Sequence, residues 1–192
     1  TPIIGYINMG TLKAKEVKKA LNSFNDMHAI IFDLRTYPNW TIYEICNYLA
    51  AEKTPFVKCI SPNINYPGKY LCDDPTTFGE QKEAPYKGRV IILINEQTQS
   101  RAEWTAMALR ALPNSICIGS QTAAADGNVS SIVLPGNYRV LMTGLGVYYP
   151  DGRETQRIGI KPDVYVEPTV DGMRQGKDEV LERAVMYAEG SN

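Results

Sequence analysis

The segment "GRVIILIN", residues 88–95, constrains the fold of this chain more than any other stretch. Its apolar residues follow one another without alternating with polar ones, which is typical of a strand covered on both faces, as in a parallel sheet. A helical pattern over residues 100–112 comes next, and then a second apolar strand at residues 115–119. This β-α-β order predicts an α/β fold with a mostly parallel sheet.

The segments before this unit repeat the same order of elements. Residues 11–24 carry apolar side chains at helical spacing, with Thr11 as a candidate N-cap. Short apolar runs on either side of this helix predict strands. In full, we expect strands at residues 2–7, 29–34 and 55–60 and helices at residues 11–24 and 41–53.

The remaining segments are less regular. Residues 61–87 are rich in Pro, Asn, Asp and Gly, so we expect a long loop with little regular structure. Residues 130–149 hold short apolar runs between Gly and Pro turns, which predicts an antiparallel excursion. A strand at 163–168 and a helix at 177–189 follow. The length of 192 residues favours one domain over residues 1–192.

Charge and cysteine content argue against several classes of function. The net charge is −1 and the basic residues are scattered, which argues against a nucleic-acid partner. The lone His28 and the cysteines at positions 46, 59, 72 and 117 lack the spacing of a metal site, so we expect neither a metal nor a cofactor. A disulfide between Cys59 and Cys72 stays open, because sequence does not give their geometry. The oligomeric state stays open as well.

Ser100 lies at the junction between the strand at 88–95 and the helix that follows it. It has two interpretations, a helix N-cap or a nucleophile presented at a strand-to-helix turn. In parallel sheets, sites gather at the carboxyl ends of strands, and residues 33–40 and 95–103 fit that rule. A helix N-terminus would also stabilise an oxyanion beside Ser100.

Four motifs, in order along the chain, resemble those of the S41 peptidases, the tail-specific or carboxy-terminal processing proteases. They are "IIFDLRTYP", "NEQTQSRAEWTAMALR", "IGSQTAAADGNV" and "QRIGIKPDV". The second resembles the nucleophile motif of that family, and the likeness covers nearly the whole chain. Its details look closest to S41-like proteins of Bacteroidetes and to the tricorn-like branch. The resemblance implies a crotonase- or ClpP-like α/β core and a serine endopeptidase that cleaves polypeptides through an acyl-enzyme on Ser100.

The resemblance also implies backbone donors for the oxyanion. The first is the N–H of Arg101, and the second comes from the turn after the "DLR" strand. The family commonly has paired glycines in that turn, where this chain has Asn39 and Trp40. Trp adopts a positive φ poorly, so the second donor requires a turn of different shape.

The general base is the residue that the motifs fail to supply. Ala125 occupies the position of the lysine in the Ser-Lys branch, which excludes such a dyad because alanine carries no basic group. In the tricorn-like branch a histidine comes from an upstream cap, and a glutamate falls near Gln156, with Glu154 two residues earlier. The chain starts at Thr1 without an initiator Met, so we expect a processed or excised core that lacks the cap and PDZ-like modules and receives its base from upstream.

Other polar residues have weaker claims to the chemistry. His28 precedes a strand and should lie at the opposite end of the sheet from Ser100. Asp33 has two interpretations, the acid of a catalytic triad or, beside Arg35, a member of a structural ion pair. Asp126 lies near the basic position of the family motif. A carboxylate is a poor base for serine unless its pKa is raised, so we expect Asp126 only to line the site.

Substrate contacts and location follow from the same reasoning. Four aromatic residues have two interpretations, the lining of an apolar substrate pocket or ordinary packing in the core or at its rim: Tyr37, Trp40, Tyr148 and Tyr149. The family implies an exported protein, periplasmic or membrane-anchored in a Gram-negative bacterium. The alternative function is a degenerate peptidase that binds polypeptides without cleaving them, which the missing lysine and Gln156 favour. An acyl-CoA enzyme of the same fold is disfavoured, because no adenine or phosphate site is evident.

Overall fold

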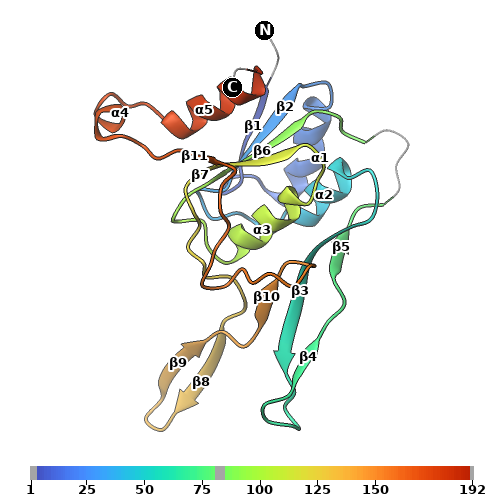
Figure 1. The fold of residues 1–192 in the computed structure, drawn as a ribbon, viewed down its shortest axis with the longest axis vertical. Coiled ribbons are helices and arrows are strands. Elements are labelled where there is room, and N and C mark those ends of the chain that lie inside the picture. The colour runs from blue at the N-terminus through green and yellow to red at the C-terminus, as the bar shows by residue number, and fades with distance from the viewer. Residues whose placement is uncertain (1–3, 81–84, 191–192) are drawn as a thin grey trace.

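The computed structural model describes residues 4–80 and 85–190. A five-stranded parallel sheet forms the centre of the molecule (Figure 1), with its strands in the spatial order β1, β2, β6, β7, β11. These strands are β1 (Ile4–Asn8), β2 (Ala29–Asp33), β6 (Arg89–Ile94), β7 (Ser115–Gly119) and β11 (Val164–Tyr165). The predicted α/β fold with a mostly parallel sheet is confirmed.

Helices cover both faces of this sheet. Helices α1 (Ala14–Ser23), α2 (Ile42–Leu49) and α3 (Arg101–Arg110) contribute to the larger core cluster, whereas α5 (Glu179–Ala188) packs on the opposite face. In β6, Ile92 faces the larger cluster, and its neighbours Ile91 and Leu93 face α5. The unbroken apolar run of β6 is therefore buried on both sides.

A second, antiparallel sheet stands beside the parallel one. Its long strand β3 (Thr54–Pro62) pairs with β10 (Gly146–Tyr148), β4 (Tyr70–Cys72) and β5 (Thr76–Phe78). Strands β8 (Ser130–Leu134) and β9 (Tyr138–Met142) form a separate hairpin. The antiparallel excursion predicted near residues 130–149 is confirmed.

The long irregular loop predicted at residues 61–87 is wrong in its described part, because β4 and β5 lie within it. Each has three residues, too few for an alternating pattern to stand out, and both depend on pairing with β3. The short helix α4 (Val170–Arg174) was not predicted. The final strand is β11 at Val164–Tyr165, shorter than the expected 163–168.

Helix α1 begins later than its candidate cap suggested. Its N-cap is Lys13, whose backbone N–H donates to the Glu16 carboxylate at 3.0 Å. Thr11 lies before the helix and donates its hydroxyl to the Asn8 carbonyl instead. The acidic side chain three residues after Lys13 therefore sets the start of the helix.

The two cysteines considered for a disulfide lie on the paired strands β3 and β4. Cys72 stands opposite Ile60, one position from Cys59. Because successive side chains of a strand point to opposite faces, Cys59 and Cys72 face different sides of the sheet. Both thiols are free, as are those of Cys46 and Cys117.

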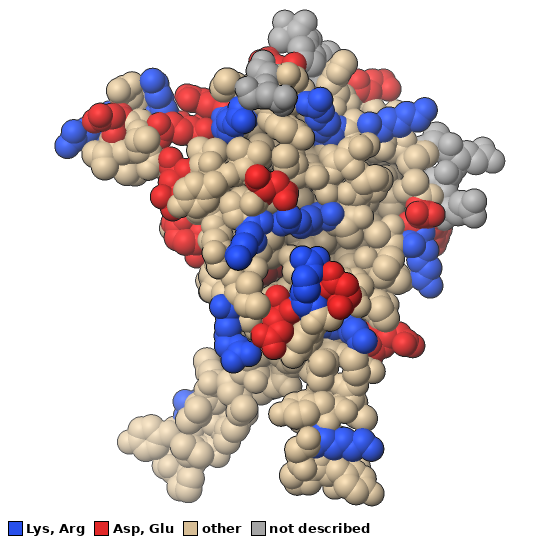
Figure 2. All heavy atoms as spheres, viewed as in Figure 1, with Lys and Arg blue, Asp and Glu red and all other residues tan. Residues whose placement is uncertain are grey.

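Two hairpin arms project from the body of the molecule, one formed by β8 and β9 and the other by β3 and β4 (Figure 1). Figure 2 shows few charged side chains on either arm. Several large apolar side chains are exposed there: Ile64, Tyr66, Tyr70, Leu71, Val133, Tyr138 and Leu141. The core contributes little to the stability of these arms, since a two-stranded ribbon is only marginally stable by itself. Within the described residues, no helix combines the length and apolar character needed to cross a bilayer.

Gly119 lies where the backbones of β6 and β7 approach closely at the carboxyl ends of the strands. Its φ is +133°, and a Cβ at this position would overlap the backbone carbonyl of Ile94. We expect Gly119→Ala to lower the free energy of unfolding by about 2–4 kcal/mol, since it adds both backbone strain and overlap. Gly152→Ala is the control, because its φ is +89° with open space around it, and it should cost only about 1 kcal/mol. Equal losses in urea unfolding would contradict this account.

Candidate active site

Ser100 sits where the turn after β6 enters α3. It is the N-cap residue of that helix, with φ 52° and ψ −120°. A non-glycine residue in this region carries backbone strain of about 1–3 kcal/mol and is held there by its surroundings. Ser100 thus takes the cap position and also has the strained backbone typical of residues at functional sites.

The buried side chain of Glu103, in the first turn of α3, holds this conformation. One carboxylate oxygen accepts the Ser100 N–H at 3.2 Å and the Ala125 N–H at 2.9 Å. The other accepts the Thr122 hydroxyl at 2.5 Å and the Ala124 N–H at 3.0 Å. Glu103 therefore joins the Ser100 turn to the loop at residues 122–125.

Further hydrogen bonds anchor both segments to the sheet. The buried Thr98 donates its hydroxyl to the Leu34 carbonyl at 3.0 Å, just beyond the end of β2. The Ala123 N–H donates to the Thr98 carbonyl, and the Ile160 N–H donates to the Thr122 hydroxyl oxygen. The turns after β2, β6 and β7 consequently form one connected edge.

A cavity of about 280 Å³ opens beside Ser100. Aromatic and aliphatic side chains make up much of its wall. Strand β3 contributes Cys59 and strand β10 contributes Val147. The lining residues are Tyr37, Trp40, Cys59, Ser100, Arg101, Trp104, Asp126, Gly127, Asn128, Leu145 and Val147. Of the residues predicted for the site, the structure brings Ser100, Arg101, Tyr37, Trp40 and Asp126 together here.

Asp126 is the charged group buried most deeply in this cavity, with 5% of its surface exposed. Its Oδ1 accepts the Gly127 N–H at 2.7 Å, whereas its buried Oδ2 has no hydrogen-bond partner among the described residues. Burial raises the pKa of Asp126 to about 7, the nearby Glu103 carboxylate adds to the shift, and the Gly127 N–H opposes it. The carboxyl group can therefore gain and lose a proton near neutral pH.

Arg101 places a cation at the cavity wall. Its guanidinium lies 5.4 Å from the ring centroid of Tyr37 and 5.2 Å from that of Trp40. It also donates to the Pro38 carbonyl at 3.4 Å. These contacts fix the aromatic side chains of the turn after β2 against the start of α3.

Gln156 is committed to backbone groups around the cavity. Its amide nitrogen donates to the carbonyls of Asp126 and Leu145 at 2.9 and 2.8 Å, and its amide oxygen accepts the Val147 N–H at 3.1 Å. Three bonds occupy this side chain, so it positions the cavity wall. The Asn39 N–H is occupied as well, since it donates to the Met9 carbonyl at 3.2 Å.

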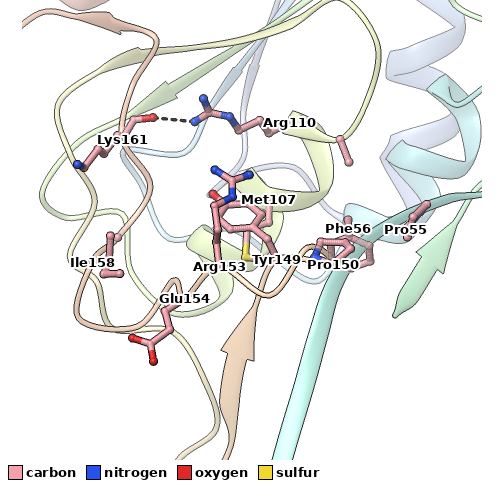
Figure 3. A pocket seen from close by; sticks show the side chains of 12 residues that line it. Pro55, Phe56, Met107, Arg110, Tyr149, Pro150, Arg153, Glu154, Ile158 and Lys161 are labelled. Carbon is pink, nitrogen blue, oxygen red and sulfur yellow. Dashed lines mark hydrogen bonds between the residues drawn. The ribbon is translucent and has the colours of Figure 1, made fainter. Parts of the chain in front are cut away.

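Like Asn39 and Gln156, two further predicted residues do not line this cavity. Tyr148 follows Val147 on β10, and successive strand residues face opposite ways, so Tyr148 points away from the face that lines the cavity. Glu154 forms an ion pair with Arg157 at 3.2 Å and lines a different, larger cavity of about 670 Å³. Figure 3 shows that larger cavity, where Arg110 donates to the Lys161 carbonyl. Neither Ser100 nor Asp126 lines it.

The expected ion pair at the end of β2 is confirmed. Arg35 contacts Asp33 at 2.6 Å and Asp178, the N-cap of α5, at 2.7 Å. Tyr6 donates its hydroxyl to Asp33 at 2.8 Å. The Arg35 hydrogen bond holds the pKa of Asp178 below its usual range. His28 lies exposed just before β2, at the opposite end of the sheet from Ser100, as the sequence predicted.

Glu103 is the site residue that the sequence analysis missed. The signal was present, because Ser100 and Glu103 have the Ser-x-x-Glu spacing of a capping box. That spacing predicts a cap, but it does not reveal the contacts to residues 122–125. In the part of the chain that the structure describes, no cluster of three or more His, Cys, Asp or Glu side chains could hold a metal ion.

The model of Peptidase family S41 matches residues 3–166. A carboxy-terminal-processing protease of Bartonella bacilliformis is 34% identical over 93 residues, which are 48% of this chain and 21% of that protein. The chain therefore spans about a fifth of that relative.

Solved structures share the fold. A candidate peptidase from Parabacteroides merdae superposes with a TM-score of 0.82 at 20% identity, covering 96% of this chain and 61% of that one. The photosystem II D1 C-terminal processing protease has a TM-score of 0.64 at 18% identity, covering 87% of this chain and 43% of that one. At these identities, the similarity establishes the fold.

Glu103→Gln tests the central carboxylate. Both oxygens of Glu103 accept hydrogen bonds, but a glutamine has one oxygen and an NH₂ group that cannot accept. At least one buried donor would therefore lose its acceptor. We expect the free energy of unfolding to fall by about 2–4 kcal/mol in urea titrations. Glu96→Gln is the matched control, because Glu96 is exposed and accepts a single 3.3 Å bond from Ser120. Comparable losses in both variants would refute the role given to Glu103.

Asp126→Asn tests the buried carboxyl group through pH-dependent stability. Because the folded-state pKa of about 7 exceeds the ordinary 3.8, the folded protein holds an extra proton between these values. The wild type should therefore lose stability as pH rises from about 4 to about 7, by at most about 4 kcal/mol, relative to Asp126→Asn. Urea unfolding of both proteins across this range measures the difference. Asp73→Asn removes an exposed charge and serves as the control, and a pH-independent difference for Asp126→Asn would contradict the raised pKa.

Proposed function

Because the chain belongs to peptidase family S41, we propose that it cleaves peptide bonds as a serine endopeptidase, through an acyl-enzyme on Ser100. The observation that carries this proposal is the strained Ser100 at the start of α3, beside a cavity that also contains a buried carboxyl group. A nucleophilic serine requires a proton acceptor, donors for the oxyanion and room for the substrate. We assign the first role to a carboxyl group and the second to the N-terminus of α3, and the cavity volume of about 280 Å³ supports the third.

The oxyanion would form at the N-terminus of α3. The Ala102 N–H already donates to the Gln99 carbonyl, and the Ser100 N–H donates to Glu103. The Arg101 N–H belongs to the first turn, where backbone donors have no intrahelical acceptor, and it is our first oxyanion donor. Since the Asn39 N–H is bound to Met9, we assign the second donor to Trp40, which lines the cavity.

The shape and lining of the cavity support a polypeptide substrate with an apolar side chain next to the cleaved bond. Tyr37, Trp40, Trp104, Leu145 and Val147 provide the apolar contacts. Their aromatic faces bury large areas of a side chain without requiring it to be charged. Asp126 lines the same cavity as Ser100, where the peptide bond would be cleaved.

For the whole protein we extend the proposal to an exported processing peptidase, periplasmic or membrane-anchored. The name of the Bartonella relative describes carboxy-terminal processing by that protein. In the tricorn-like branch that the sequence resembles, the base comes from an upstream cap, whereas the cavity of this chain contains the carboxyl group of Asp126. A base from outside these 192 residues and a base at Asp126 predict different effects of replacing Asp126.

Fluorophosphonate labelling tests the nucleophile. We expect one covalent adduct on Ser100, located by mass spectrometry, and loss of both the adduct and peptide hydrolysis in Ser100→Ala. Ser131→Ala is the control, since Ser131 is an exposed serine on the β8 strand, and it should label as the wild type does.

The alternative of a peptide-binding protein without activity gives a different result. Wild type and Ser100→Ala would then bind an apolar peptide equally, and neither would form an adduct while a known serine hydrolase in the same tube reacts. An adduct on a serine other than Ser100 would also refute the proposal.

A further inference from the structure

The loop that carries Asp126 is fixed at a short distance from Ser100. The same Glu103 oxygen accepts the Ser100 N–H at 3.2 Å and the Ala125 N–H at 2.9 Å. The two backbone nitrogens therefore lie no further apart than the sum of these distances, and Asp126 is the next residue after Ala125. Both Ser100 and Asp126 line the same cavity.

The buried carboxyl group of Asp126 is only partly hydrogen-bonded within the described part of the chain. Its Oδ2 is fully covered and has no partner among the described residues, although Oδ1 is bound to the Gly127 N–H. Buried acceptors normally have a donor, because an unpaired one costs free energy. Ser100, whose hydroxyl is a possible donor, lines the same cavity as Asp126.

The backbone of Asp126 is held from the other side as well. Gln156 donates to the Asp126 carbonyl at 2.9 Å and simultaneously binds Leu145 and Val147. This places Gln156 as a positioning residue, which fixes the carboxyl group without contacting the reacting atoms. The loop that resembles the lysine-bearing motif thus presents a carboxyl group one residue after the alanine that replaces the lysine.

From this geometry we infer that Asp126, in place of a residue outside these 192, accepts the proton of the Ser100 hydroxyl. The inference rests on the proposed function, since it assigns a role within the same reaction. The charged and titratable groups around Asp126 are Glu103 and Arg101 of α3 and Cys59 of β3. With a pKa near 7, Asp126 is ionised often enough to act as a base and is basic enough to hold the proton.

Asp126 carries one proton in each half of the reaction. As Ser100 Oγ forms a bond to the peptide carbonyl carbon, its proton passes to Asp126. When the tetrahedral intermediate collapses, the C–N bond breaks and Asp126 returns this proton to the leaving amine. A water molecule then loses a proton to Asp126 as it attacks the acyl-enzyme, and that proton goes back to Ser100 Oγ when the ester bond breaks.

The test measures the rate of fluorophosphonate labelling at Ser100 between about pH 5.5 and pH 8.5. We compare the wild type, Asp126→Asn and Asp73→Asn, in the 192-residue chain. Asp73 is the matched control, because it is an exposed carboxylate that does not line the cavity. Like Asp126, it raises the pKa of Cys59 through its charge. Circular dichroism and urea unfolding confirm that each variant is folded.

We expect the wild-type rate to rise with pH around a midpoint near 7 and to level off above it. At pH 8, Asp126→Asn should label about 100-fold more slowly, as expected for loss of a general base, while Asp73→Asn stays within about twofold of wild type. The wild-type pH profile provides a test even if Asp126→Asn fails to fold.

Two results would overturn the role of Asp126 and leave the proposed function standing. They are labelling of Asp126→Asn at the wild-type rate, which indicates a base elsewhere, and a wild-type rate that does not change with pH. Absence of any adduct on wild-type Ser100 across the whole range would instead overturn the proposed function, and the role of Asp126 with it.

Discussion

The Glu103 carboxylate accepts four hydrogen bonds in the interior of the protein, and the geometry of the site depends on them. Two oxygens bind donors from the Ser100 turn and from the loop at residues 122–125, segments separated by about twenty residues of helix and strand. Charge-assisted bonds of this kind are strong enough to offset a strained backbone of a few kcal/mol. Glu103 can therefore hold Ser100 at φ 52° and, through the same oxygen, fix the loop that leads to Asp126.

The parallel sheet explains why these segments can meet. Strands β2, β6 and β7 are neighbours and run in the same direction, so their carboxyl ends lie at one edge. Each of the following turns is attached to the next: Thr98 binds the Leu34 carbonyl, and Ala123 binds the Thr98 carbonyl. Because the strands themselves are buried on both faces, the edge is a rigid support, and local strain at Ser100 does not relax into the sheet.

Local patterns in the sequence were sufficient for the elements with strong periodicity and insufficient for contacts between distant segments. The apolar run of β6 and the serine motif before α3 predicted the parallel sheet and the position of Ser100, and both are observed. Strands β4 and β5 were missed, since three residues give no clear period and their pairing with β3 decides their conformation. The sequence placed Asp126 in the site, but its raised pKa depends on burial in the folded chain, which no local pattern contains.

Burial of Asp126 connects stability to chemistry. A fully hydrated carboxylate has a pKa near 4 and would return a proton to water far more readily than accept one from serine. Desolvation raises its basicity, but the folded protein is then less stable whenever the group is ionised. The Gly127 N–H limits that penalty at Oδ1, whereas the buried Oδ2 has no hydrogen-bond partner among the described residues. A substrate that fills the cavity would exclude more water and raise the proton affinity of Asp126 further, so binding itself would prepare the carboxylate to accept the serine proton.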